Sequence, residues 1–272
     1  MRQAWLGIGV VLGAAALGLG AALYGSGDRV QAPAAAGTRT RAPVVVELFT
    51  SEGCSSCPPA DRVLARLAAD QPVQTAHVIV LSEHVDYWNR LGWRDPFSSE
   101  AFSARQRAYD GAVFRSGQVY TPQMVIGGQL QVVGSDYPAV VDAIMQVAAQ
   151  AQPFSLTLAV NADRSGIGVH VAASPASGTA IAGDVEVVVA IAEDGLTREV
   201  RAGENGGKTL SHTGVARTLM PVGRLTPRMP RFEATTVVAV KPEWNLARMR
   251  VVAFAQEVES RRVLGAVVAQ PS

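Results

Sequence analysis

The sequence predicts an α/β domain over residues 43–152, followed by an all-β, sandwich-like domain over residues 153–272. In the first segment, short apolar runs rich in β-branched residues alternate with stretches whose apolar residues recur every three or four positions, the helical spacing. In the second segment, apolar and polar residues alternate, and Gly, Asp, Asn and Ser separate the runs. With 272 residues and 48% apolar content, the chain has enough material for two such domains.

The charge of the chain is nearly balanced, with 24 basic and 23 acidic residues and a formal net charge of +1. A protein that binds nucleic acid or an anionic membrane surface carries a basic excess that neutralises phosphates. We therefore expect no nucleic-acid partner.

The N-terminus, residues 1–25, reads as a signal peptide or an N-terminal membrane anchor. Ala4 to Tyr24 is uncharged and about as long as a bilayer span requires, with Arg2 on the inner side. Small-residue cleavage candidates such as Ala34 to Ala36 lie well downstream, which favours an uncleaved anchor. Residues 26–42 read as a flexible tether. We expect the body to be extracytoplasmic, either periplasmic or secreted, or held at the inner membrane by this segment.

The elements of the first domain follow in a regular order. "PVVVELFT" (43–50) predicts a central strand, and "PPADRVLARLAAD" (58–70) predicts a helix whose prolines suit a first turn. "HVIVLSEHV" (77–85) predicts a second strand, and "SSEAFSARQRAYDGAV" (98–113) an amphipathic helix. "VYTPQMVIGGQLQVVGS" (119–135) predicts a hairpin around a Gly-Gly turn, and "DYPAVVDAIMQVAAQ" (136–150) a closing helix.

Both cysteines of the chain lie in "TSEGCSSCPPAD" (50–61), between the first predicted strand and the first predicted helix. Cys54 and Cys57 at this spacing can form a disulfide, bind a metal with ligands from elsewhere, or serve as two small buried residues. The order of elements around this Cys-x-x-Cys motif resembles the thioredoxin fold. Thioredoxin-like proteins carry a proline, usually cis, opposite the dithiol, and "VYTPQMVIGG" is similar to that stretch of glutaredoxins. The resemblance implies that Pro122 is cis and that the backbone of Thr121 pairs with substrate.

The chain also resembles one family of secreted bacterial proteins, the domain of unknown function numbered 1223. The resemblance is carried in order by "VVVELFTSEGCSSCPPAD", "VDYWNRLGWRDPF", "RQRAY", "VYTPQMVIGG" and "RAGENGGKTL". It covers nearly the whole chain after the tether and implies a thioredoxin-like domain, but it implies no particular reaction.

The thiol chemistry follows from the position of the cysteines. A cysteine just before a helix N-terminus lies at the positive end of the helix dipole, which favours the thiolate. We expect Cys54 to attack as the more exposed thiol and Cys57 to resolve the mixed disulfide. A Glu52 side chain that points inward would oppose the thiolate. Glu47 on the preceding strand resembles the buried acid of thioredoxins and is a candidate proton relay.

A long polar and aromatic loop, "SEHVDYWNRLGWRDPF" (82–97), follows the second strand. Tyr87 and Trp88 in this loop either bind substrate or cover the surface of the domain itself. His84 is the histidine nearest to the dithiol by topology and is either a proton carrier or simply hydrogen-bonded.

The second domain contains a glycine-rich stretch, "GENGGKTLSHTG" (203–214). It lacks the Gly-x-x-x-x-Gly-Lys pattern and the strand-to-helix context of a phosphate loop, so it reads as a sandwich loop. We expect Lys208 and His212 to be solvated there.

Three classes of function are consistent with these residues. The first is an exported thiol-disulfide oxidoreductase that acts on a protein or small thiol or disulfide, with an unknown redox partner and no cofactor. The second is a non-catalytic binding module with a structural disulfide. The third, a copper carrier, is disfavoured because no methionine-rich or histidine-rich cluster lies near the cysteines, so we expect no metal. Reducibility of the Cys54–Cys57 pair distinguishes the first two.

Overall fold

The computed structural model describes residues 41–163 and 166–271. The predicted signal or anchor at 1–25, and all but the last two residues of the tether at 26–42, lie outside the described residues. Within the part that is described, no helix is both long enough and apolar enough to cross a bilayer.

The described chain is mostly strand, with three α-helices and several short helical turns. The strands are β1 (Ala42–Thr50), β2 (Ala76–His84), β3 (Gln123–Ile126), β4 (Leu130–Val133), β5 (Phe154–Asp163), β6 (Gly166–Pro175), β7 (Val185–Glu193), β8 (Leu196–Glu199), β9 (Thr209–His212), β10 (Val215–Leu225), β11 (Phe232–Val238), β12 (Met249–Glu257) and β13 (Val263–Ala269). The helices are α1 (Pro58–Asp70), α2 (Glu100–Tyr109) and α3 (Tyr137–Ala148), with short turns η1 (Asn89–Leu91), η2 (Asp110–Phe114, a π-helical turn), η3 (Gly203–Asn205) and η4 (Leu246–Arg248).

From β1 to α3, strands and helices follow one another in the predicted order. Helix α1 starts at Pro58 directly after Cys57, its N-cap residue. The Gly-Gly turn between β3 and β4 is also confirmed, because Gly127 and Gly128 both have positive φ angles, 59° and 71°. A β-carbon on Gly128 would lie 1.9 Å from the carbonyl oxygen of Arg261, so the turn excludes larger residues for steric reasons as well.

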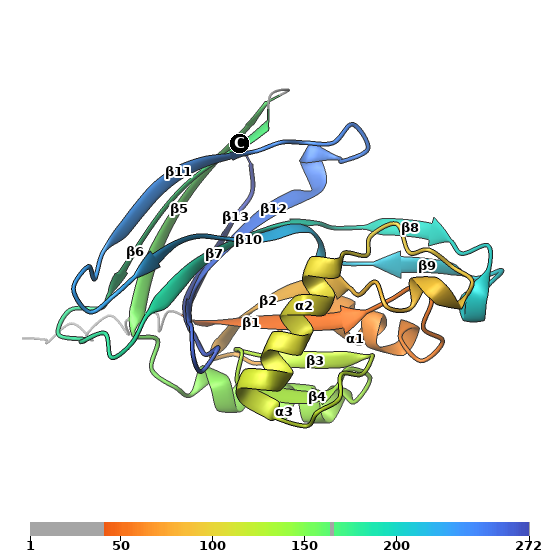
Figure 1. Ribbon diagram of the computed structural model, residues 1–272, viewed down its shortest axis with the longest axis horizontal. Coiled ribbons are helices and arrows are strands. Elements are labelled where there is room, and N and C mark those ends of the chain that lie inside the picture. The colour runs from red at the N-terminus through yellow and green to blue at the C-terminus, as the bar shows by residue number, and fades with distance from the viewer. Residues whose placement is uncertain (1–40, 164–165, 272) are drawn as a thin grey trace, which may run out of the picture. The chain divides into compact units, whose positions relative to one another are not determined.

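The predicted fold class is wrong, because the strands of the two segments do not form separate domains. They join in one mixed sheet of eight strands, in the order β13-β12-β7-β10-β2-β1-β3-β4 (Figure 1). Four of these strands come from the segment that we expected to fold alone as a sandwich. The two halves meet between β2 and β10, which pair in parallel at a single position, Val215 opposite Ser82.

The physical reason lies in the residue pattern of β1 and β2. Their central stretches, VVVELF and VIVL, are mostly apolar, and both strands are buried at nearly every position, so each needs cover on both faces. On one face Val45, Ile79 and Leu81 pack with Val252 and Phe254 of β12, which makes the C-terminal strands part of the same core. A pattern of buried strands predicts that both faces are covered, but it does not say which segment covers them.

The opposite face of β1 and β2 is covered by α1 and α3. Leu64 of α1 and Ile144 of α3 pack with Val46 and Leu48 of β1 in a core of aliphatic side chains. Helix α2 lies on the other face, where Tyr109 packs edge-on against Phe49 at a centroid distance of 6.1 Å. The end of β1 that leads into the cysteine loop is therefore enclosed by helices on both sides.

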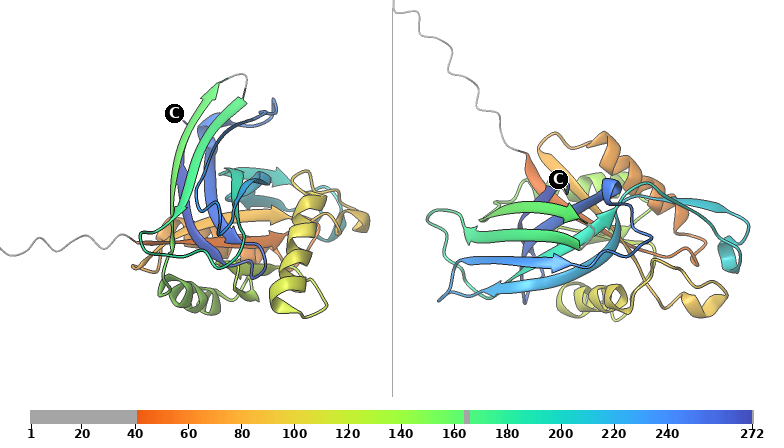
Figure 2. Two further views of the ribbon diagram at one scale, coloured as in Figure 1. Left: turned by 60° about the vertical axis from the view of Figure 1, so that its left-hand side comes forward. Right: turned by 90° about the horizontal axis from the view of Figure 1, so that it is seen from above.

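The remaining strands form two small sheets. A three-stranded sheet, β11-β6-β5, lies against β12 and β13 and closes a second apolar core (Figure 2). Strands β8 and β9 pair only with each other, and their hairpin projects beside the loops that follow β1 and β2 (Figure 1). This hairpin brings residues from near position 205 to the cysteine loop.

Candidate functional site

The two cysteines form a disulfide in the loop between β1 and α1. Their Cα atoms are 5.4 Å apart, and the loop is tightened by backbone hydrogen bonds from Cys54 to Ser51 and from Cys57 to Cys54. Both cysteines are fully buried, with 0% exposure each. The expectation that Cys54 is the more exposed thiol is therefore wrong, because segments distant in sequence pack over both residues.

The first covering segment is the turn that precedes β3. The Thr121–Pro122 peptide bond is cis, as predicted. The Thr121 hydroxyl donates a hydrogen bond to Cys54 Sγ at 3.3 Å, and the indole N–H of Trp88 donates to Thr121 Oγ1 at 2.8 Å. The structure thus brings together Cys54, Thr121 and Trp88, which the sequence had assigned to one site.

Tyr87 lies next to this group and is half-buried. Its hydroxyl donates to Gln106 of α2 at 3.1 Å. Burial is the main cause that raises the pKa of this phenol above its usual value. Tyr87 therefore attaches the loop to α2, and its predicted contact with substrate stays a prediction.

The β8–β9 hairpin is the second covering segment. The Asn205 amide donates to the carbonyl oxygens of Glu52 and Cys54, at 2.9 and 2.8 Å, and Asn205 is fully buried. The exposed Glu204 accepts from the backbone N–H of Ser55 at 3.0 Å. Hydrogen bonding to the side chain of Ser55, and then to this backbone N–H, lowers the pKa of Glu204. Lys208 is exposed, as predicted, and donates to Asn205 Oδ1.

Below the cysteine loop lies a group of buried ionisable side chains that we call the histidine cluster: Glu52, Asp61, His84, Asp95 and His212. His84 Nδ1 lies 2.6 Å from Asp95 Oδ2, and His212 Nε2 lies 3.2 Å from Glu52 Oε1. The two imidazole rings pack edge to face at a centroid distance of 4.9 Å. The expectation that His212 is solvated is wrong, because it is only 3% exposed.

The cluster is tied to the cysteine loop by its backbone and side chains. Asp95 Oδ2 accepts the N–H of Glu52 at 2.8 Å, and Trp93 Nε1 donates to Glu52 Oε2 at 2.9 Å. Asp61, in the first turn of α1, accepts from the Thr50 hydroxyl at 3.1 Å. Glu52 points inward, which is the orientation expected to oppose a thiolate at Cys54. Its two carboxylate oxygens, however, are bound by the His212 imidazole and the Trp93 indole.

Burial and pairing set the protonation of this cluster. Burial alone would lower the pKa of His84, but the adjacent Asp95 carboxylate reverses this, so the pKa of His84 is raised. Burial likewise opposes the charge on Asp95, and His84 holds its pKa below the usual range. For Asp61 burial dominates and raises the pKa, although His212 and His84 partly offset it. The cluster therefore contains one strong ion pair and one carboxyl that resists ionisation.

Glu47 belongs to a different group on the α2 side of the sheet, which we call the arginine cluster: Glu47, Glu83, Arg105, Tyr109 and Gln256. Glu47 accepts from Arg105 and from the Tyr109 hydroxyl, so its bonds lead toward α2. Burial opposes its charge, but Arg105 outweighs burial and lowers its pKa. For Glu83, burial and the neighbouring Glu47 raise the pKa well above the usual value. Relay roles for Glu47 and His84 stay predictions.

Metal binding requires several donors at one point. Among residues 41–163 and 166–271, no group of three or more His, Cys, Asp or Glu side chains is arranged to hold a metal ion. The five members of the histidine cluster are used in bonds with one another and with neighbouring groups.

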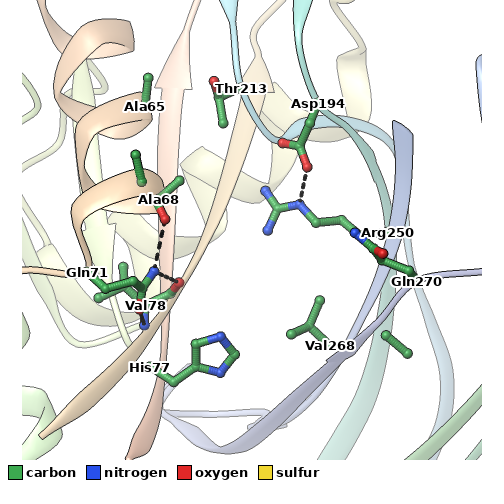
Figure 3. Close-up of a pocket in the computed structure, with 12 residues that line it drawn as sticks. Ala65, Ala68, Gln71, His77, Val78, Asp194, Thr213, Arg250, Val268 and Gln270 are labelled. Carbon is green, nitrogen blue, oxygen red and sulfur yellow. Dashed lines mark hydrogen bonds and ion pairs between the residues drawn. The ribbon is translucent and has the colours of Figure 1, made fainter. Parts of the chain in front are cut away.

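A pocket of about 520 Å³ lies elsewhere, between α1, β2 and β12 (Figure 3). Its polar groups include His77, whose pKa is lowered by burial and by the nearby Arg41 and Arg250. Arg250 is paired with Asp194 at 3.0 Å and donates to the Val80 carbonyl at 2.7 Å. None of the lining residues belongs to the cysteine loop, so we place the candidate site at the disulfide.

Sequence reasoning missed the residues that approach the cysteines from far along the chain. They are Asn205, Glu204 and His212 of the hairpin and Asp95 of the long loop. The signal for the hairpin was present, because "RAGENGGKTL" is one of the stretches that carry the family resemblance, although nothing in it forms a phosphate loop.

The chain is similar to known proteins at the level of a family and of a fold. The family model "Protein of unknown function (DUF1223)" matches residues 45–256. The chain belongs to the DUF1223 family. This family match spans both segments of the eight-stranded sheet, together with the cysteine loop and the hairpin that covers it.

Two solved structures are similar to this member of the DUF1223 family. Protein AGR_C_4864 from Agrobacterium tumefaciens shares 27% identity with a TM-score of 0.64, over 85% of this chain and 96% of that chain. HBP35 of Porphyromonas gingivalis shares 14% identity with a TM-score of 0.64, over 85% of this chain and 76% of that chain, which indicates a shared fold only. No curated protein gives a significant match.

Proposed function

We propose that the protein is an exported thiol-disulfide oxidoreductase whose redox-active group is the Cys54–Cys57 pair. The observation that supports this most strongly is the hydrogen bond from the Thr121 hydroxyl to Cys54 Sγ. The Ser56 hydroxyl lies 3.4 Å from the same sulfur, whereas no side-chain hydrogen bond to Cys57 Sγ is found among the described residues. A disulfide that only cross-links the chain needs no such donors, while a sulfur that becomes a thiolate is stabilised by them.

The exchange step has a defined balance in this proposal. In the reducing direction, the Cys54 thiolate attacks one sulfur of a client disulfide, and the other client sulfur leaves as a thiolate. The Cys57 thiolate then attacks Cys54 Sγ, the mixed disulfide breaks, and the second client sulfur leaves as a thiolate. Two electrons pass from the cysteine pair to the client. The reverse sequence oxidises a client dithiol.

Access to the pair is part of the proposal, because both cysteines are buried. The half-buried Trp88 and Thr121 cover Cys54, and the exposed tip of the β8–β9 hairpin covers the loop backbone. A client must therefore displace one of these segments before its sulfur reaches Cys54. The substrate is a protein or small thiol or disulfide that can replace these contacts.

The compartment belongs to the same proposal. A disulfide between the cysteines is in keeping with an oxidising environment. Together with the predicted signal or anchor at residues 1–25, it supports a periplasmic or secreted location, with the membrane as a partner if that segment is uncleaved. A separate redox partner would restore the pair after each exchange.

The test is a measured reduction potential combined with trapping. We expect the pair to equilibrate with thiol buffers and to have a reduction potential above about −300 mV. Structural disulfides usually have reduction potentials below this value. Cys57→Ser should accumulate a mixed disulfide on Cys54, because no neighbouring thiol can release it, and Cys54→Ser should trap little. Mass spectrometry of alkylated protein from the native compartment measures the mixed disulfide in both variants.

A second candidate function, a binding module with a structural disulfide, is supported by one specific observation. The buried Asn205 amide donates to the carbonyl oxygens of Glu52 and Cys54, an arrangement that favours a cross-link that never opens. A pair that resists ordinary dithiol reductants, with equally poor trapping in both cysteine variants, would reject the enzyme and favour this module.

A further inference from the structure

Three segments of the chain meet at Cys54 Sγ through two consecutive hydrogen bonds. Trp88 Nε1 lies 2.8 Å from Thr121 Oγ1, and Thr121 Oγ1 lies 3.3 Å from Cys54 Sγ. Trp88 comes from the long loop after β2, Thr121 from the turn before β3, and Cys54 from the loop after β1. The three groups therefore form a short chain that ends on the sulfur.

The direction of this chain follows from the chemistry of its members. An indole N–H can only donate, whereas a hydroxyl has one proton and two lone pairs. Because the Thr121 oxygen accepts a hydrogen bond from the indole N–H, one of its lone pairs is occupied, and its own proton can point toward the sulfur. We propose that Trp88 is a positioning residue for the proposed thiol-disulfide exchange, and that its indole aligns the Thr121 hydroxyl so that it donates to Cys54 Sγ.

The indole is held in place by its surroundings. Trp88 packs against the buried group of Phe49, Val85, Tyr109 and Val125. Its side chain starts so close to the cysteine loop that a β-carbon on Gly53 would lie 3.3 Å from Trp88 Cβ. A donor fixed in this way costs little conformational entropy when it orients a partner, so the alignment persists while Cys54 changes its charge.

The consequence for the reduced protein is a more stable Cys54 thiolate. Hydrogen bonds in series polarise one another, so the hydroxyl donates more strongly when the indole donates to it. A donor at the thiolate lowers the pKa of the thiol and makes Cys54 the better nucleophile or leaving group. This inference rests on the proposed function, and it assigns to Trp88 a role inside the protein as well as its predicted contact with substrate.

Other ionisable groups near the cysteine loop also influence Cys54. They are Glu52, Asp61, His84, Asp95, His212 and Glu204 around the loop, and Tyr87 beside Thr121. None of them is changed in the variants below, so a difference between variants reports on the Trp88–Thr121 chain.

The experiment measures the pKa of Cys54 in the full chain carrying Cys57→Ser, where Cys54 is the only thiol. Thiolate absorbance and the pH dependence of alkylation both give this value. We expect Trp88→Phe to raise the pKa of Cys54 by about half a unit to one unit, and Thr121→Val by about one unit, a tenfold change in thiolate ratio. Thr121→Ser keeps the hydroxyl and should restore the original value.

Two further variants separate positioning from packing. Trp88→Phe combined with Thr121→Val should match Thr121→Val alone, because the indole acts through the hydroxyl. Trp244→Phe removes an indole that packs near Arg217 instead, and it should leave the pKa of Cys54 unchanged.

The opposite results would overturn the inference. If the indole merely shields Cys54, its loss admits water, and hydration lowers the pKa of the thiol or leaves it unchanged. Additive effects in the double variant would also reject an indole that acts through Thr121. The measurement needs no client, so the two failures are distinguishable: this inference fails if the variants leave the pKa of Cys54 unchanged, whereas the exchange proposal fails in the trapping test. If Cys57→Ser does not fold, alkylation of Cys54 in the reduced wild-type chain, mapped by mass spectrometry, gives the same comparison.

Discussion

The arginine cluster and the histidine cluster are both buried next to β1 and β2, but they are built from different chemistry. In the arginine cluster, Arg105 keeps its charge at every accessible pH, and it attaches α2 to the sheet through Glu47. In the histidine cluster, His84 is the cation that pairs with Asp95, and an imidazole can lose its charge near neutral pH. The ion pair that anchors α2 is therefore permanent, whereas the ion pair that anchors the cysteine loop depends on pH.

The largest expected effect comes from breaking the arginine cluster. Arg105→Met should lower the free energy of unfolding by about 3–5 kcal/mol, because it leaves the Glu47 carboxylate buried without its cation. Urea denaturation measures the loss. Adding Glu47→Gln should recover part of it, since the amide carries no charge.

The matched control is Arg66→Met, which breaks an exposed ion pair with Asp70 on α1. Such surface pairs are worth about 0–1 kcal/mol. If the Arg105 and Arg66 variants lost similar stability, the arginine cluster would not be the anchor that its burial indicates.

A smaller effect is expected where the hairpin closes the cysteine loop above the histidine cluster. Asn205→Ala leaves the carbonyls of Glu52 and Cys54 without their buried donor, which should cost about 1–3 kcal/mol. The same change should speed the reduction of the disulfide by dithiothreitol, followed by alkylation at timed intervals. Asn245→Ala, which removes an exposed cap of η4, should leave the rate of reduction unaltered. Equal rates in the Asn205 variant and the wild type would show that the hairpin does not control access.

The smallest effect is a difference in pH dependence. The pKa of His84 is raised in the folded state, so its stabilisation is complete below the unfolded value of about 6.5 and is lost as the pH rises through the folded value. The lowered pKa of Asp95 acts at the acid end, where its stabilisation is lost as the pH falls below about 4. The pair is therefore most effective between these two limits.

His84→Gln should remove the alkaline part of this dependence. We expect the free energy of unfolding, measured by urea denaturation from about pH 5.5 to about pH 8.5, to decline less steeply with pH in the variant than in the wild type. This range brackets the ordinary pKa of histidine. Glu83 and Asp61, whose pKa values burial raises, contribute their own decline in both proteins. Parallel curves for the two proteins would mean that His84 does not titrate with folding.

Local pattern was enough to predict what lies close together in sequence. The strand before Cys54, the helix after Cys57 and the Gly127–Gly128 turn are all decided within a few residues. The cis bond at Pro122 and the assignment of Thr121 to the site of Cys54 came from the resemblance to thioredoxin-like proteins, and the assignment of Trp88 came from the position of its loop after the second strand. The strand, the helix and the turn depend on periodicity and turn chemistry, which a single sequence records.

The rest depends on contacts between distant segments. The strand patterns of β7 and β12 are equally suited to a separate sandwich and to an extension of the first sheet, and the packing of Phe254 with Ile79 decided between them. His212 has the polar, glycine-rich neighbours of a surface loop, so its sequence predicts solvent. Only its pairing with Glu52, 160 residues earlier, makes it a buried residue.

The long separation between Asn205 and the cysteine loop also sets an order of events during synthesis. Cys54 and Cys57 are neighbours and can be oxidised as soon as the loop leaves the ribosome or the translocation channel, whereas Asn205 follows Cys54 by 151 residues. At about 5–20 residues per second, the pair waits for roughly eight to thirty seconds before Asn205 is synthesised. The newborn chain therefore offers an open dithiol to any oxidant it meets, and the finished protein does not.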